Sequence, residues 1–144
     1  MKKTEDITLA APCGIYCGEC EAYKAKDDPA LMERMKNLKT LKTELLPCPG
    51  CRTVRGKCLA VDGICETYSC VVEHAVDFCF ECPEFPCTKL NPAADGAERL
   101  PHNIKVFCLC CIQRQGLTSF AERYPEIKQR YFRGKMAIGR GPQL

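Results

Sequence analysis

Three pairs of cysteines, each separated by two residues, constrain the folding of this chain more than any other sequence feature. Two intervening residues allow a tight turn that directs both sulfur atoms toward one ion, and glycine permits the positive φ that such turns need. Each pair therefore predicts half of a tetrahedral metal site, which a second pair or single cysteines complete. The pairs are Cys17-Gly-Glu-Cys20, Cys48-Pro-Gly-Cys51 and Cys79-Phe-Glu-Cys82.

The total number of cysteines supports a framework built on sulfur. The chain has 14 cysteines in 144 residues, a density typical of disulfide or metal scaffolds. Its N-terminus lacks the apolar stretch of a secretory signal, because Thr4, Glu5 and Asp6 interrupt it. No apolar run is long enough to predict a membrane span. We therefore predict a cytoplasmic protein, whose reduced thiols bind metal rather than form disulfides.

The apolar composition suggests why metal is needed. Leu, Ile, Val and Phe together make up 31 of the 144 residues, close to the level of about 20% at which chains stop folding unaided. A structural zinc ion contributes roughly 10–16 kcal/mol of apparent binding free energy, comparable to the whole stability of a domain. The free energy of metal binding would therefore supply stability that a small hydrophobic core lacks.

The net charge is a weak indicator of the partner. The formal value of +3 treats every thiol as neutral, whereas four thiolates around Zn²⁺ carry a net −2. Two such sites would change the protein's balance to about −1. Nucleic acid is thus a weakly supported partner, and a protein or small molecule is the broader expectation.

Apolar periodicity predicts a mainly helical chain. Asp28 and Pro29 begin a helix as N-cap and first helical residue, and apolar residues at steps of three and four continue it to Pro47. A second helix is predicted over 66–78, with Thr67 as its N-cap and Cys70, Val71, His74, Ala75 and Phe78 on one stripe. The apolar segment 104–115 is ambiguous between helix and strand, and we favour helix.

The last third of the chain carries several interruptions. Residues 91–103 are turn-rich and predict a surface loop. Ser119 and Glu122 offer a capping box for a helix that Pro125 should interrupt, with a restart after it. The predicted fold is a small, α-rich, metal-stabilised single domain over 1–144 with irregular cysteine-knuckle loops. Residues 1–12 would form an N-terminal arm and 134–144 a loose tail.

Iron–sulfur chemistry is the main competitor to zinc. Cys13, Cys17 and Cys20 have the C-x3-C-x2-C spacing also found in radical S-adenosylmethionine enzymes, but the strand–helix alternation of their barrel is missing. The ferredoxin cysteine run is absent as well. Thiolate softness alone does not separate zinc from an iron–sulfur cluster. Zinc leads, and an iron–sulfur or thiol-redox protein is the alternative.

Catalytic patterns are sparse. The two histidines are His74, on an apolar helix stripe and expected to be packed or capped rather than a ligand, and His102, expected in a solvated loop. Neither a Ser/His/Asp set nor a phosphate-binding glycine loop occurs. Three glutamates near the knuckles, Glu19, Glu81 and Glu84, could serve as acid or base at a catalytic zinc, although surface carboxylates are the simpler interpretation. Cys108, Cys110 and Cys111 are interpreted as small buried packing residues, although their C-x-C-C run is ambiguous and a role as ligands stays open, as does the role of Cys58.

The order of the cysteine motifs resembles a known family. APCGIYCGEC, CPGC (48–51), CETYSC (65–70) and FCFECPEFPC (78–87) are similar to the cysteine-rich domain-of-unknown-function family DUF3795, which comprises short, mainly prokaryotic proteins expected to bind zinc. The resemblance covers about 8–135 and includes a closing helix, GLTSFAERYPEIKQRYFRGK. Many relatives end in a further cysteine pair, whereas this chain ends MAIGRGPQL. The resemblance implies these ligands: Cys13, Cys17, Cys20, Cys48, Cys51, Cys65, Cys70, Cys79, Cys82 and Cys87.

These observations predict a cytoplasmic zinc-binding protein whose metal sites are structural and which serves as a binding or scaffold module. Closed four-cysteine sites leave no open coordination position, which argues against catalysis. Sequence spacing does not fix which sulfurs share an ion. We predict one site from Cys48, Cys51, Cys65 and Cys70, and a second in which 79–82 and Cys87 meet members of the N-terminal cluster.

Overall fold

A computed structural model describes residues 6–90 and 104–144. The fold is mostly helical, as predicted. The predicted loop 91–103, which includes His102, lies outside the described residues. The α-helices are α1 (Glu21–Lys24), α2 (Pro29–Lys36), α3 (Glu66–Glu73), α4 (Ile104–Gln115) and α5 (Leu117–Arg133). Three 3-10 turns, η1 (Cys17–Glu19), η2 (Thr43–Leu45) and η3 (Cys79–Glu81), and two strands, β1 (Lys135–Ala137) and β2 (Gly141–Gln143), complete the described elements.

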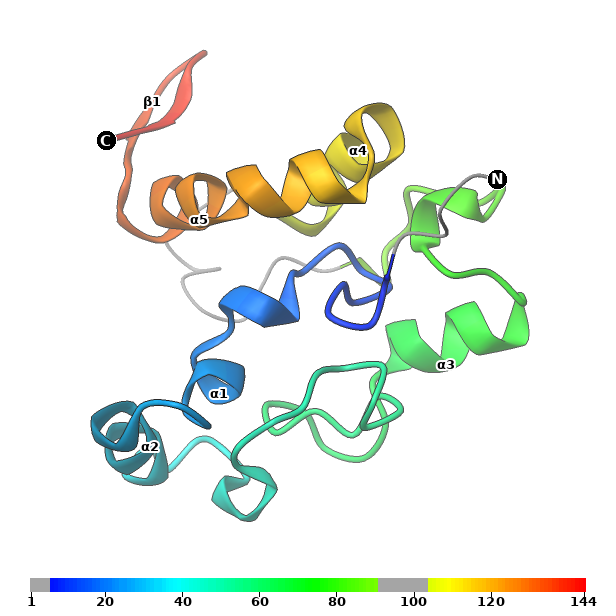
Figure 1. The fold of residues 1–144 in the computed structure, drawn as a ribbon. Helices are drawn as coiled ribbons and strands as arrows, with labels where there is room; N and C mark the ends of the chain where they lie inside the picture. Colours follow the sequence, from blue (N-terminus) through cyan, green and yellow to red (C-terminus); the bar gives the residue numbers. More distant parts are fainter. Residues whose placement is uncertain (1–5, 91–103) are drawn as a thin grey trace.

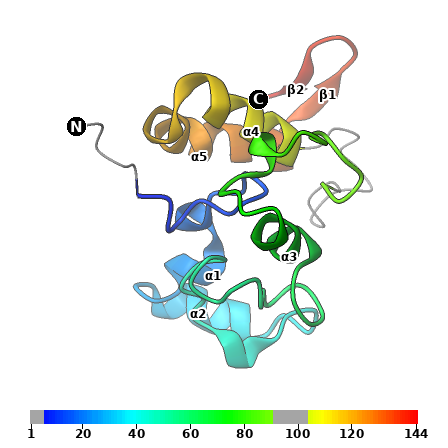
Figure 2. The same ribbon diagram turned by 90° about the vertical axis from the view of Figure 1, so that its right-hand side faces the viewer.

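The helices form two groups on opposite sides of the N-terminal segment. The pair α4 and α5 lies on one side, and α1, α2 and the long loop after them lie on the other (Figures 1 and 2). Residues 6–16 run between the two groups in both views. Each group has its own set of buried apolar side chains, so the two are described in turn.

The larger core surrounds α4 and α5. Phe120 and Leu109 are fully buried there, and Tyr131 is buried to 1% exposure. The N-terminal segment contributes Ala10, and Phe78 joins from the segment that precedes η3. Burial of large apolar side chains is worth about 1.5–3 kcal/mol each. This core is therefore stabilised by hydrophobic packing.

The smaller core lies under α1 and α2. Its buried residues are Ala22, Met35 and Leu59, with partly buried leucines and Cys20 and Cys48 packed around them. Few large apolar side chains are buried here, so hydrophobic burial contributes much less to this half.

Helix α2 begins as predicted but ends early. The Asp28 carboxylate accepts a hydrogen bond from the Leu31 N–H at 3.0 Å, and Pro29 occupies the first turn. The helix stops at Lys36, and Leu41 reaches the smaller core from a non-helical segment. The backbone N–H of Lys42 donates to the Leu59 carbonyl at 3.0 Å, which turns the chain away from the helix axis. The predicted four-turn helix to Pro47 is therefore wrong in its second half.

Helix α3 is shorter than predicted and has a different N-cap. It starts after Cys65 and ends at Glu73 rather than continuing to residue 78. The Thr67 hydroxyl donates to the Lys89 carbonyl at 3.3 Å instead of capping the helix. Thr67 thus fastens α3 to a distant loop, a tertiary role that local sequence does not reveal.

Helix α4 spans the predicted 104–115, but α5 corrects the prediction that follows it. The helix α5 begins after Gly116, whose φ is 82°, and runs through Pro125 without a break. Proline inside a helix costs about 3 kcal/mol. Phe120 and Tyr124 bury one face of α5 against the larger core, and this packing outweighs the local penalty.

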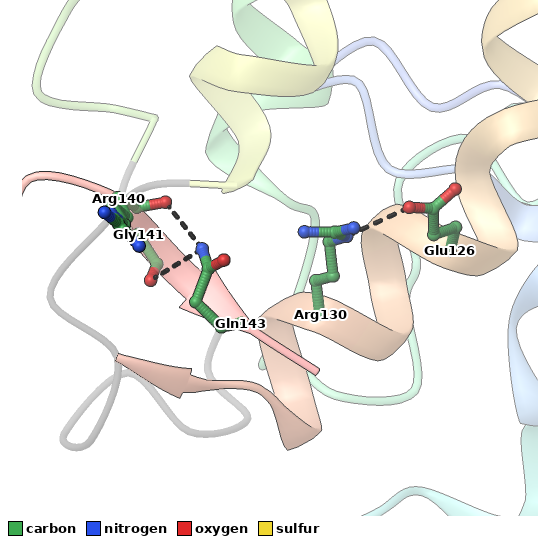
Figure 3. A network of polar contacts seen from close by, with 5 residues as sticks. All are labelled: Glu126, Arg130, Arg140, Gly141 and Gln143. Carbon is green, nitrogen blue, oxygen red and sulfur yellow. Dashed lines mark hydrogen bonds and ion pairs between the residues drawn. The ribbon is translucent and has the colours of Figure 1, made fainter. Parts of the chain in front are cut away.

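The C-terminal residues are more regular than the predicted loose tail. β1 pairs antiparallel with β2, and Lys135 lies opposite Gln143. The Gln143 side-chain amide donates to the carbonyls of Arg140 at 2.9 Å and Gly141 at 3.4 Å (Figure 3). In α5 the Arg130 guanidinium donates to Glu126 at 3.0 Å, an exposed pair one helical turn apart. The hairpin thus gives the end of the chain a defined backbone pairing.

Candidate metal centre

Two of the three cysteine pairs adopt the same local turn. The pair Cys17–Cys20 encloses η1, and Cys79–Cys82 encloses η3. In each turn the N–H of the second cysteine donates to the carbonyl of the first, at 2.9 Å and 3.1 Å respectively. The predicted tight turns therefore form at both positions.

The third pair meets the first across a long stretch of sequence. Gly50 takes a φ of 110°, a conformation that favours glycine, inside the pair Cys48–Cys51. The Cys51 backbone N–H then donates to the Cys17 sulfur at 3.4 Å. Such a hydrogen bond favours a thiolate on Cys17, which is the form that binds metal. Cys17 and Cys51, which are 34 residues apart in the sequence, thus bring their two pairs together in the fold.

Further sulfurs surround this meeting point. Burial raises the pKa of the Cys17 thiol to about 11, and the neighbouring Cys20, Cys13 and Cys48 add to the shift. Burial also raises the pKa of Cys51 well above its usual value. A buried group of thiols with raised pKa values is neutral without a cation, and a divalent ion would compensate both burial and mutual repulsion. We call the following set the first cluster: Cys13, Cys17, Cys20, Cys48, Cys51, Cys58 and Cys65.

A second group of cysteines lines a pocket of about 450 Å³ between α3 and the segment 76–90. Burial raises the pKa of Cys79 to about 12, with Cys13, Cys87, Cys70 and Cys82 as the thiol neighbours that raise it further. The cysteines of this second cluster are Cys70, Cys79, Cys82 and Cys87.

The division between the clusters differs from the predicted grouping at one residue. Cys48, Cys51 and Cys65 belong to the first cluster, but Cys70 lies in the pocket of the second. Cys13 is a neighbour of thiols in both, and the Cys79 N–H donates to the Pro12 carbonyl at 3.1 Å. The predicted approach of 79–82 to the N-terminal cluster thus runs through residues 12 and 13. Which sulfurs bind an ion stays a prediction.

Arg52 connects the two clusters. Its guanidinium donates to the Ala10 carbonyl at 2.7 Å and to the Asp77 carbonyl at 2.6 Å. It also lies 4.9 Å from the centre of the Phe78 ring. One side chain therefore holds the N-terminal segment, the loop after Cys51 and the start of η3 together.

Sequence reasoning undervalued His74. In the part of the chain that the structure describes, one group of three side chains places metal-binding atoms within 4.8 Å of one another, and it consists of His74, Cys82 and Glu84. Sequence spacing gives no signal for this group, because His74 ends α3 whereas Cys82 and Glu84 lie beyond the loop that follows it. Of the two expected forms, the packed histidine is wrong, since His74 is exposed, but the imidazole does cap the end of α3, where its Nδ1 lies 2.8 Å from the Cys70 carbonyl oxygen.

The other two candidate glutamates have structural partners. The Glu81 carboxylate accepts the backbone N–H groups of Asp77 at 2.9 Å and Phe78 at 2.6 Å, so it caps η3. Glu19 forms an ion pair with Lys24.

The cysteines of α4 behave as the sequence predicts for packing residues. Cys108 is fully buried and Cys111 is 7% exposed, and both belong to the larger core. Cys110 is half-buried. Burial raises the pKa of the Cys108 thiol far above its usual value, which keeps it neutral.

Comparisons with known proteins give a family but no activity. A family described as a protein of unknown function, DUF3795, matches residues 9–92, more than half of the chain. All ten predicted ligands fall inside this segment, and α4 and α5 fall outside it. Neither a curated protein nor a solved structure matches the chain significantly. Among the described helices, none combines the length and apolar character that crossing a membrane requires. The chain belongs to the DUF3795 family of proteins of unknown function.

Proposed function

We propose that this chain is a cytoplasmic zinc-binding protein whose metal sites are structural. The observation that carries the proposal is the meeting of two cysteine pairs in the first cluster. The Cys51 N–H donates to the Cys17 sulfur, and Cys48 and Cys20 are neighbours. Four sulfurs from two tight pairs match the donor set of a structural zinc site. In this proposal Cys17, Cys20, Cys48 and Cys51 hold one ion.

The surroundings of the first cluster support a structural role. Cys20 and Cys48 pack against the smaller core, which buries only Ala22, Met35 and Leu59 among the described residues. A four-cysteine site is closed and leaves no position for a substrate. The ion would then contribute the free energy that this small core lacks. The remaining predicted ligands, Cys13, Cys65, Cys70, Cys79, Cys82 and Cys87, would serve further binding.

The proposed biological role is a binding or scaffold module. Closed metal sites argue against catalysis at the first cluster, and its reduced thiols suit the cytoplasm. The partner would be another protein or a small molecule.

Elemental analysis of protein purified without air tests the proposal. We expect at least one zinc per chain, colourless protein, and loss of one zinc in Cys51→Ser. Cys110→Ser is the matched control, because Cys110 lies on α4 outside both clusters, and it should keep the full zinc content. Brown protein that contains iron and inorganic sulfide would overturn the zinc assignment in favour of the iron–sulfur alternative. Protein without any bound metal would overturn both.

A further inference from the structure

The pocket of the second cluster contains donors that a closed four-cysteine site does not need. A ring nitrogen of His74, the sulfur of Cys82 and a carboxylate oxygen of Glu84 lie within 4.8 Å of one another. We propose that these three side chains bind a second divalent ion of the zinc class, with its remaining coordination position open to a small anionic ligand. The inference rests on the proposed function only in that both need metal, and the two sites share none of their ligands.

The hydrogen bond of His74 prepares its ring for a metal. The Nδ1 atom lies 2.8 Å from the Cys70 carbonyl oxygen. A carbonyl only accepts, so Nδ1 carries the proton and donates. In the neutral imidazole this leaves the lone pair on Nε2, the arrangement that metal-binding histidines obtain from a backbone carbonyl. The contact thus fixes both the tautomer and the ring orientation.

The backbone brings the three donors together from two segments. His74 is the C-cap of α3, so it sits at a defined helix end. Cys82 closes the turn η3, and Glu84 follows it by two residues. Ligand atoms around a tetrahedral zinc ion lie roughly 3.3–3.8 Å apart, from bond lengths of about 2.0–2.3 Å. Closing from 4.8 Å requires shifts of about 1 Å, which the exposed side chain of Glu84 can make by rotamer adjustment while His74 keeps its hydrogen bond.

The composition of this site differs from that of the first cluster. Three protein ligands that mix nitrogen, sulfur and oxygen, plus one exchangeable position, are typical of zinc sites that bind a water or substrate. The adjoining pocket of about 450 Å³ is large enough for a small molecule.

A positive charge stands at the pocket wall. Lys89 lines the pocket, and its ammonium lies 3.6 Å from the Cys70 sulfur. A lysine beside a metal favours a ligand that carries negative charge. A carboxylate or a similar small anion is therefore the class of ligand that this position would take.

One competing arrangement uses the same pocket. Cys70, Cys79, Cys82 and Cys87 would hold the ion alone, with His74 and Glu84 beside it. Replacing Cys82 would remove metal in both cases, so the histidine and the glutamate are the informative positions. Both are exposed, and their replacement leaves the cores intact.

The test uses the full chain titrated with Co²⁺ under reducing conditions. We expect His74→Ala to bind one Co²⁺ fewer per chain, or to bind the second ion at least ~10-fold more weakly, and Glu84→Gln to weaken the same step. Glu66→Gln removes an exposed carboxylate from the first turn of α3 and should bind as the wild type does. Thiocyanate should shift the visible cobalt bands of the wild type and leave those of His74→Ala unchanged.

The outcomes separate this inference from the proposed function. Full cobalt content and an unchanged spectrum in both His74→Ala and Glu84→Gln would assign the pocket ion to sulfur alone and overturn the inference. Insensitivity of the wild-type bands to thiocyanate would overturn the open position. Loss of metal from Cys51→Ser, together with wild-type behaviour of His74→Ala, would leave the first site standing and remove only the second. Loss of metal in His74→Ala but not in Cys51→Ser would support the pocket site and overturn the first site.

Discussion

The two halves of this molecule are stabilised by different means. Around α4 and α5, large side chains such as Phe120, Leu109 and Tyr131 are buried to 1% exposure or less. Under α1 and α2 the buried core of the described residues reduces to Ala22, Met35 and Leu59, and Cys20 and Cys48 of the first cluster pack against it. One half therefore has a hydrophobic interior of ordinary kind, whereas the other has sulfur where apolar side chains would normally lie.

This difference explains how a chain with so few aliphatic residues can fold. Its apolar side chains are concentrated in one half rather than spread thinly over both. The other half depends, in our proposal, on the binding free energy of an ion. If that is correct, the two halves should respond differently to every treatment that acts on metal or on packing alone.

Metal removal should give the largest difference. A strong chelator removes a contribution of roughly 10–16 kcal/mol from the half that holds the first cluster. We expect backbone amides in 20–65 to lose their protection from hydrogen exchange, while amides in α4 and α5 keep a substantial part of theirs. Loss of protection in both halves at the same chelator concentration would contradict the comparison. An unchanged pattern of hydrogen exchange after chelation would contradict the proposal that the protein binds a structural metal ion.

A cavity in the larger core should destabilise that half of the molecule without releasing metal from the other. Phe120 is fully buried, and Phe120→Ala should lower the free energy of unfolding by about 3–5 kcal/mol. Metal content should not change, because the four proposed ligands Cys17, Cys20, Cys48 and Cys51 are not among the residues of the larger core to which Phe120 belongs. The control is Met35→Ala in the smaller core, which should cost about 2–5 kcal/mol and also weaken metal binding. Equal effects of both variants on metal affinity would show that the halves are not independent.

Arg52 tests the connection between the clusters. Its two hydrogen bonds to the carbonyls of Ala10 and Asp77 and its contact with the Phe78 ring should make Arg52→Ala cost about 2–4 kcal/mol. Arg52→Lys should recover little, since an ammonium cannot reproduce the fork of the guanidinium. Denaturant unfolding measures both, with the exposed Lys57→Ala as control. A loss below about 0.5 kcal/mol for Arg52→Ala would mean that the clusters are held together by other contacts.

The sequence predicted those elements whose causes are local. Asp28 and Pro29 set the start of α2 through a hydrogen bond three residues away, and the tight turns of the cysteine pairs need only their own backbone. The apolar segment 104–115 forms the favoured helix, and Ile104, Cys108 and Ile112, spaced four residues apart, are buried on one face of it.

The failures have tertiary causes. Pro125 is tolerated because α5 is buried on both sides of it, by Phe120 and Tyr124 before it and by Tyr131 after it. After α2 ends at Lys36, the backbone of Lys42 bonds to Leu59, a contact between residues distant in the sequence that a continued helix would not make. The assignment of Cys70 to the second cluster and the proximity of His74 to Glu84 depend on how the loop 76–90 returns to α3. The spacing of residues along the chain contains no information about how a loop folds back against a helix.

A final prediction separates packing cysteines from candidate ligands by their response to alkali. Burial raises the pKa of Cys108 in the folded state far above its ordinary value of 9.0, so the folded protein keeps a proton that the unfolded chain releases. The stability that this thiol contributes is complete below about pH 9 and is lost as the pH rises from there toward the folded pKa, by up to about 1.4 kcal/mol per pH unit.

The measurement is the free energy of unfolding of the wild type and Cys108→Ala between pH 8 and about pH 10.5, each at fixed metal content. The packing cost of the variant is constant over this range, so the two curves should converge as the pH rises. Leu109→Ala, which removes an equally buried side chain that cannot ionise, should run parallel to the wild type. Parallel curves for Cys108→Ala would mean that its thiol ionises in the folded protein as readily as in the unfolded chain. Cys108 would then be reachable by solvent, and the larger core would not be the dry interior that distinguishes it from the sulfur-rich half.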